Sequence, residues 1–259
     1  MLRRVWTFLR NSWLAYKGVS LWLNPQAYMI EKVINPIFRF LFYSFLILYG
    51  YKEKTNIAAF ILGNAILLSS ISALKGVGII YFSERQQGTL IYFIVSPRSR
   101  LRIIIQKIFF HIIDAFITVL IGLTIIFTGF KIYHPPHQLV FIFLLIIIGV
   151  ISVSLFGSLI ASLGLLSRDI NMLLNGMEIL MILLSGVNIP ISRFPTFLKY
   201  LSQIFPLSHL MEGLNLIIQD KISMAIPYIV SEIGLLITYF LLGQFIIKFL
   251  ERKARHIGN

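Results

Sequence analysis

Long apolar runs are the feature that most limits what this chain can fold into. A helical run of about 20 apolar residues spans roughly 30 Å of hydrocarbon at about 1.5 Å per residue. Strands of a transmembrane barrel are shorter and alternate in polarity, which these runs do not. The sequence therefore predicts an all-α integral membrane protein with six transmembrane helices, at residues 27–50, 56–80, 103–130, 138–166, 170–189 and 224–250.

Charge is scarce and unevenly placed along the chain. Only 13% of its 259 residues are charged, against about a quarter in a soluble domain. Of the 23 Lys and Arg residues, 15 lie in or near the segments on the side of the predicted termini, and six lie near the opposite face. Because Lys and Arg accumulate on the cytoplasmic side, both termini are predicted to be cytoplasmic. The basic residues are scattered over separate loops, so they indicate topology and contact with membrane lipids rather than nucleic-acid binding.

Residues 1–24 have the pattern of an amphipathic helix lying in the membrane interface. Apolar and aromatic residues recur at three- and four-residue steps, and basic residues take the opposite side. A frayed tail is the alternative. The segment lacks the apolar core of a signal peptide, so we expect it to be retained.

The segment "SERQQGTLIYFIVSPRSR", residues 83–100, is the most hydrophilic stretch between predicted spans. It combines charged residues with an apolar patch at residues 90–95, Gly88 allows a bend, and Ser96-Pro97 is a typical helix start. A helix resting on lipid and a helix docking into a groove on a soluble partner both fit this pattern. The residues alone leave these two interpretations open.

This segment resembles the signature of type-2 ABC exporter permeases, the membrane subunits of one class of ATP-driven exporters. The matching features are Glu84, the Gly88-Thr89-Leu90 run, a short hydrophobic helix, Ser96-Pro97 and a basic start to the next span. A second match is "LLSGVNIPISRFPTFLKYLSQIFPLSHLMEGLNLII", which is similar to the Ser-Gly-x-x-x-Pro and Phe-Pro-Leu-Ser elements of the family. The order of the motifs agrees with the family along nearly the whole chain.

The resemblance implies a half-channel, residues 1–259 as one permease domain, that dimerises with a second permease copy or a homologous permease. Two cytoplasmic ATPase subunits would carry ATP and Mg, and the membrane would be the cytoplasmic membrane of a prokaryote. Residues 83–97 would be the coupling helix, with Glu84 oriented by the partner or by Arg98 or Arg102. The residues expected to contact the ATPase are Glu84, Arg85, Gly88, Thr89, Leu90, Ile91, Ile94 and Pro97.

The chain itself is not expected to be an enzyme or to bind a cofactor. No Gly-Lys pair occurs, which a Walker A loop requires, and the absence of cysteine excludes disulfides and thiolate metal sites. Neither HExxH nor GxSxG occurs, and no carboxylate cluster suits a metal. We therefore expect no catalytic, cofactor-binding or metal residues.

Residues 190–223 form the long segment predicted on the outer side. Three prolines cut this mostly apolar stretch into pieces too short to cross the membrane, which favours short re-entrant helices before the last span. In the resembled family such helices cap the translocation path, although an ordinary lid without substrate contact fits equally well.

Ionisable residues inside the spans should face protein, water or the interface, because a charge at a helix centre costs about 2.5–3.5 kcal/mol. Lys107, His111 and Asp114 share one helical face, so we expect a polar seam with Asp114 paired to His111 or Lys107; a proton relay is the alternative. Glu178 lies in the span that lines the path in the resembled family, where it could face substrate or form a buried ion pair. The possible substrate path comprises Glu178, Asn188, Phe205 and His209.

The expected function is thus an exporter permease for a drug, antibiotic, natural product or lipid-like substrate. The Glu-x-x-x-Gly-Thr-Leu form resembles that branch more than the polysaccharide branch of the family. A polysaccharide or lipid-linked glycan exporter is the alternative within the family, and a non-transporting scaffold or sensor partner is the alternative outside it.

Overall fold

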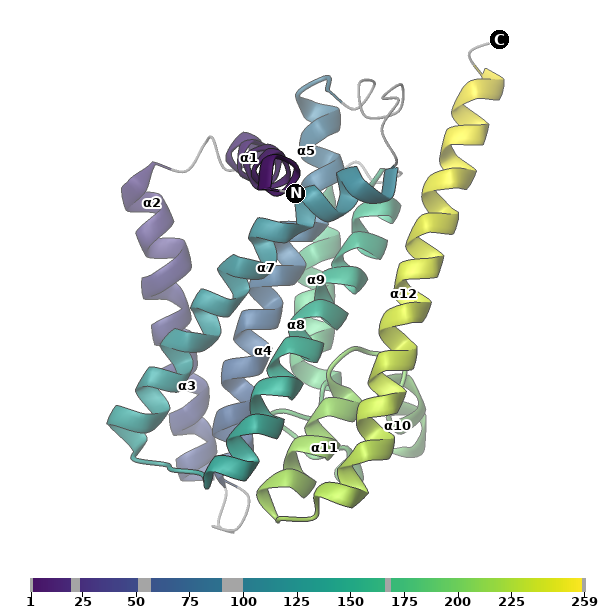
Figure 1. Cartoon of the computed structure of the whole chain (residues 1–259). Coiled ribbons are helices and arrows are strands. Elements are labelled where there is room, and N and C mark those ends of the chain that lie inside the picture. The colour runs from purple at the N-terminus through teal and green to yellow at the C-terminus, as the bar shows by residue number, and fades with distance from the viewer. Residues whose placement is uncertain (1, 20–23, 51–56, 90–99, 166–168, 258–259) are drawn as a thin grey trace.

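The computed structural model describes residues 2–19, 24–50, 57–89, 100–165 and 169–257. Over these residues every regular element is a helix, and the long helices run side by side in a bundle (Figure 1). The α1 helix lies across one end of the bundle, where α5 and the C-terminal end of α12 also lie; α10 and α11 lie towards the other end. We refer to these as the α1 end and the α11 end.

The long helices match most of the predicted spans. Five continuous helical stretches are long and apolar enough to cross a membrane, among the residues that the structure describes. In chain order they are α2, η1 and α3 (Pro25–Met29, Ile30–Ile34, Asn35–Gly50), α4 and α5 (Ile57–Gly78, Ile80–Gln86), α7 and η3 (Arg100–Ile125, Ile126–Phe130), α8 (Pro136–Gly164) and α12 (Ile222–Ile257). The prediction of an all-helical multi-pass membrane protein is confirmed.

The helix in the fifth predicted span is shorter than expected. It is α9, Ile170–Leu184, which has 15 residues where the sequence predicted a span to residue 189. Gly186 adopts φ +76 just after the helix, a left-handed conformation that commonly ends helices. Apolar residues continue after Leu184, so hydropathy alone did not reveal this end. A sixth crossing of the membrane remains a prediction.

The core of the bundle lies around α4, most of whose residues are buried. This helix packs closely against α7 and α8 because small residues lie at the contacts. A Cβ on Gly157 of α8 would lie 3.3 Å from the Leu74 carbonyl oxygen, and one on Gly122 of α7 would lie 2.8 Å from Ala65 Cβ. The central helix thereby positions the polar side chains of its neighbours.

The N-terminal segment forms the helix α1, Leu2–Val19; its predicted place in the membrane interface stays a prediction. Its aromatic side chains pack on α7: Phe8 lies 5.4 Å from Phe109, and Trp13 lies 5.3 Å from Phe110, between ring centroids. Tyr16 is buried there, whereas Trp6 is largely exposed. After this helix, the Asn24 side chain accepts a hydrogen bond from the Ala27 backbone N at 2.7 Å and begins α2.

The segment before the last span contains short helices, as its prolines predicted. These are η4 (Ile191–Arg193), α10 (Thr196–Ser202) and α11 (Ser208–Ile218). Pro190 and Pro195 directly precede the first two of them. Between α10 and α11 the chain turns at Leu207, which has φ +74.

Candidate functional site

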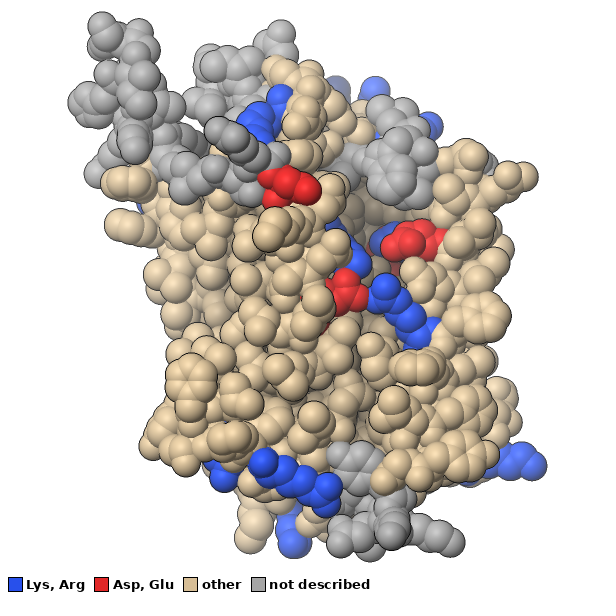
Figure 2. All heavy atoms as spheres, turned by 180° about the vertical axis from the view of Figure 1, so that it is seen from behind, with Lys and Arg blue, Asp and Glu red and all other residues tan. Residues whose placement is uncertain are grey.

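Charged side chains gather inside the α1 half of the bundle, in a recess of a face whose middle otherwise carries few charges (Figure 2). We call the first group the Asp114 cluster. Asp114 of α7 accepts hydrogen bonds from the hydroxyls of Tyr28 at 2.8 Å and Tyr16 at 3.1 Å. Lys32 Nζ lies 2.8 Å from Asp114 Oδ2 and donates to Ser72 Oγ at 3.1 Å. Both carboxylate oxygens of Asp114 are therefore engaged, by residues of α1, α2 and η1.

The predicted partner of Asp114 is wrong. Asp114 forms its ion pair with Lys32, while Lys107, about two turns earlier on the same face of α7, pairs with Glu84 of α5. Buried His111 lies beside Gly76 of α4, where an added Cβ would meet its Nδ1 at 2.4 Å. The seam residues thus face different neighbouring helices, because the helical face they share is contacted by several elements.

A second group, the Glu178 cluster, lies between α3, α4 and α9. Glu178 is 7% exposed and forms ion pairs with Arg39 of α3 and Lys75 of α4. The buried ion pair that the sequence left as an alternative for Glu178 is therefore present. The side chain of Arg39 is 41% exposed, although it lies within a helix long enough to span the membrane. Hydrocarbon is an unfavourable environment for such a charge, so this face suits water or protein better than lipid tails.

A pocket of about 480 Å³ opens between the two clusters. Its walls come from α1, α2, η1, α4, α7 and α9. The polar lining consists of Tyr16, Glu31, Lys32, Lys75, His111, Asp114, Asn171 and Asn175, and the apolar lining of Ala27, Ile30, Gly76, Ile79 and Leu174. Lys32 lies in a π-helical turn, a distortion that is frequent at functional sites. A cavity with apolar walls and a few convergent polar groups is a typical small-molecule site.

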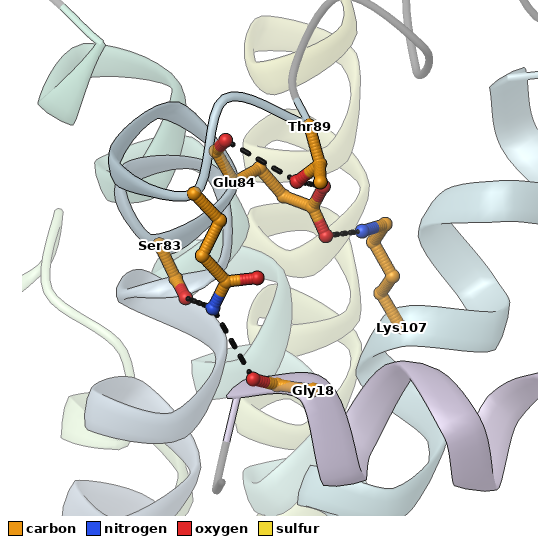
Figure 3. Close-up of polar contacts among 6 residues, drawn as sticks. Gly18, Ser83, Glu84, Thr89 and Lys107 are labelled. Atoms are coloured by element: carbon orange, nitrogen blue, oxygen red, sulfur yellow. Dashed lines mark hydrogen bonds and ion pairs between the residues drawn. The ribbon is translucent and has the colours of Figure 1, made fainter. Parts of the chain in front are cut away.

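The third group surrounds Glu84 near the end of α5 (Figure 3). The Glu84 carboxylate pairs with Lys107 of α7 and accepts a hydrogen bond from the Thr89 hydroxyl. The chain turns back towards Glu84 at Gly88, which adopts φ +69. As a result the Thr89 hydroxyl lies beside the Glu84 carboxylate, and the Thr89 backbone N donates to the Glu84 carbonyl at 2.9 Å. Lys107 thus holds Glu84 from within the bundle, and no contact of Glu84 with Arg102 is found among the described residues. Arg98 lies outside the described residues, so its expected role stays a prediction.

Residues close to Glu84 in the sequence form hydrogen bonds from the end of α5 to two further helices. Arg85 donates to the Leu165 carbonyl, just after α8, at 2.8 Å and lies over the Phe82 ring at 5.1 Å. Gln87 donates to the Gly18 carbonyl of α1 at 3.2 Å (Figure 3). The end of α5 therefore contacts α1, α7 and α8 together. The remaining predicted coupling residues, Leu90, Ile91, Ile94 and Pro97, lie outside the described residues.

The four predicted path residues lie in two separate places. Glu178 belongs to the cluster above, whereas Asn188 follows the end of α9 and Phe205 lies 5.9 Å from Phe156 by ring centroids. His209 lies 3.3 Å from the Gln203 carbonyl, and burial lowers its pKa below the ordinary value. Among the described residues, no hydrogen bond or ion pair joins Glu178 to Phe205 or His209.

Sequence reasoning missed several members of these clusters. Lys32 has no role in the sequence-based prediction, Lys75 has only that of a basic residue near the cytoplasmic face, and Tyr16 only that of an interfacial aromatic. A Lys within an otherwise apolar window is itself a signal, because it requires a buried partner or water. Matching each such Lys with an Asp or Glu of another span would have suggested both clusters.

Comparison with known proteins agrees with this architecture. The model of the ABC-2 type transporter family matches residues 3–218, which is most of the chain. No match is found among curated proteins. The matched family domain is a membrane permease without a nucleotide-binding domain of its own. The resemblance seen in the two sequence motifs is thereby confirmed, and the chain belongs to the ABC-2 type transporter family as a multi-pass membrane permease subunit.

Proposed function

We propose that this permease subunit forms half of the translocation pathway of an ABC exporter for amphiphilic substrates: drugs, antibiotics, natural products or lipid-like molecules. The observation that carries the proposal is the pocket between the Asp114 and Glu178 clusters, in a chain of the ABC-2 type transporter family. In this proposal residues 1–259 form one permease domain.

The composition of the pocket supports an amphiphilic substrate. Ile30, Ile79 and Leu174 offer apolar contact, while Asn171 and Asn175 of α9 offer amide groups. The cations Lys32 and Lys75 already have carboxylate partners, so they favour a dipolar or weakly charged head over a strongly anionic one. A polysaccharide would instead need a long polar groove lined by aromatic and hydroxyl groups, which this pocket does not resemble.

The exposed charge of Arg39 supports a dimeric pathway. A second permease copy or a homologous permease facing α3 and α9 would enclose the Glu178 cluster between two subunits, away from lipid. The pathway would then lie between the two copies.

The end of α5 is where we place the coupling to the ATPase. Two cytoplasmic ABC ATPase subunits, carrying ATP and Mg, would dock on the segment that follows Thr89. Since Glu84 and Arg85 contact α7 and α8, movement of the docked segment would reach both helices directly. Both termini and this segment would be cytoplasmic, in the cytoplasmic membrane of a prokaryote.

Co-purification from the native host, followed by reconstitution, tests the proposal. We expect an ABC ATPase to accompany the tagged permease and ATP to drive an amphiphilic dye into inside-out vesicles. Single cysteines at exposed Gln87 and Tyr200 test the topology, because the native chain contains no cysteine. Labelling of Gln87→Cys from the outside of sealed cells, or assembly without an ATPase, would contradict the proposal and favour a scaffold role.

A further inference from the structure

A buried carboxylate at the α11 end belongs to none of the three charged groups. Glu232 of α12 is fully buried, with 0% of its surface exposed. Among the residues that the structure describes, no ion pair to it is found. An ionisable residue inside a span is unfavourable and indicates a functional task. An apolar residue of similar volume would serve the stability of the core as well or better.

The hydrogen bonds of Glu232 indicate its function. Its Oε1 atom accepts hydrogen bonds from Ser152 Oγ of α8 at 2.5 Å and from the Leu207 backbone N at 3.2 Å. Leu207 is the residue at which the chain turns between α10 and α11, with φ +74. Residues other than Gly rarely adopt this conformation, so it persists only where the surroundings hold it. The carboxylate thus accepts a hydrogen bond from the strained residue itself.

Two further hydrogen bonds stabilise the same turn. Tyr239, two turns after Glu232 on α12, donates its hydroxyl to the Ile204 carbonyl at 2.6 Å. Ser208, next to Leu207, donates its hydroxyl to the Leu184 carbonyl at 3.0 Å. Leu184 is the last residue of α9, the helix that carries Glu178. The turn therefore connects α12 and α8 to the end of α9.

We propose that Glu232 is a positioning residue that keeps the outer end of the translocation pathway closed by holding the Phe205–Ser208 turn against α9. The inference deepens the proposed function and rests on it for the meaning of "outer". Glu232 acts as a hydrogen-bond acceptor in this role, and its charge is not required. Release of the Leu207 N–H would free the turn and, through Ser208, the end of α9.

Cysteine accessibility beside the start of α11, directly after the turn, tests this role. Val187 is fully buried beside Gly63 of α4, where Met211 of α11 also packs. A Val187→Cys protein in nanodiscs, where both faces are open to reagent, is labelled with a charged maleimide. Glu232→Leu keeps a similar volume without an acceptor, and Glu232→Gln keeps an acceptor oxygen without the charge. Ser152→Ala is the matched control, because it removes the other donor and leaves the Leu207 bond.

We expect Glu232→Leu to accelerate labelling about tenfold, the change expected when one strong hydrogen bond no longer holds a local unit closed. ATP-driven transport should fall by a similar factor, while Glu232→Gln and Ser152→Ala stay close to the parent. Unchanged labelling in Glu232→Leu would overturn the proposal. An equal acceleration of labelling in Glu232→Gln would also overturn the proposal, because it would show that the charge of Glu232 is required.

A second variant covers the case in which Glu232→Leu does not fold. Ser208→Ala removes only the hydroxyl that bonds the Leu184 carbonyl, and it should accelerate labelling by a smaller factor. No acceleration there would count against the role of the turn. Labelling needs neither ATPase nor substrate, so a failure of transport in the parent protein would overturn the proposed function while the labelling result stands.

Discussion

At the α1 end, Asp114 and Glu178 each pair with a cation from another helix. Towards the α11 end, the polar partners of Glu232 among the described residues are a hydroxyl and a backbone N–H. The first two carboxylates lie at or beside a pocket, and the third is fully enclosed. Ion pairs beside water can exchange partners when a ligand arrives, while an enclosed acceptor can only hold its donors. We therefore expect the polar contacts at the α1 end to change when a ligand binds, and those of Glu232 to stay in place.

The largest effect is expected at Asp114. Asp114→Leu leaves Lys32 and two tyrosine hydroxyls without their acceptor, which should lower the free energy of unfolding by about 3–5 kcal/mol. Thermal unfolding in detergent would measure it. Asp114→Asn should cost about a third as much and keep most transport, because the amide preserves shape and some hydrogen bonding. Complete loss of transport in a folded Asp114→Asn protein would favour a proton relay.

A charge exchange at Glu84 and Lys107 should have the next largest effect. Glu84→Lys or Lys107→Glu alone places like charges in contact and should reduce substrate-stimulated ATP hydrolysis about tenfold, with the ATPase still bound. The double exchange should recover most of the stimulation. If it recovers none, Glu84 acts on the ATPase directly and its contact with α7 is incidental.

Removal of a single hydroxyl at the α1 end should have a modest effect. Tyr16→Phe deletes the bond to Asp114 and keeps the ring that packs on α7, so a loss of about 1 kcal/mol is expected. Proteolysis of α1 in the reconstituted protein would report the weaker docking. Tyr49→Phe, on a largely exposed ring of α3, is the control and should change nothing.

The smallest effect is expected at the exposed pair of His137 and Asp220, whose side chains lie 2.9 Å apart. The pair lowers the pKa of Asp220, so its contribution is present above the ordinary Asp range and is lost as pH falls through the lowered pKa. Asp220→Asn should shift the thermal midpoint barely measurably at neutral pH. Any difference in thermal midpoint between Asp220→Asn and the parent protein should disappear at a pH below the lowered pKa of Asp220.

Much of the fold follows from local patterns, while the site depends on contacts that such patterns do not encode. Hydropathy predicted six spans, five of which correspond to long helices, and prolines predicted the breaks before η4 and α10. The end of α9 was missed because Val187 and Ile189 continue the apolar run past Gly186.

The site was harder to predict because its partners are far apart in the chain. Helical spacing suggested that Asp114 pairs within α7, but a π-helical turn in another span supplies Lys32. Glu178 was correctly considered for an ion pair without its partners being named. Glu232 is one of the few ionisable residues within the predicted spans, yet nothing in the sequence connects it with Leu207.

Filling the pocket tests the central claim most directly. Asn175→Trp places an indole in the cavity from an exposed position of α9, and Met172→Trp adds the same group at an exposed position of α9 outside the pocket lining. The measurement is the substrate-stimulated ATP hydrolysis of each reconstituted complex. We predict that Asn175→Trp abolishes the stimulation and leaves basal hydrolysis, while Met172→Trp resembles the parent. Full stimulation in Asn175→Trp would contradict the account.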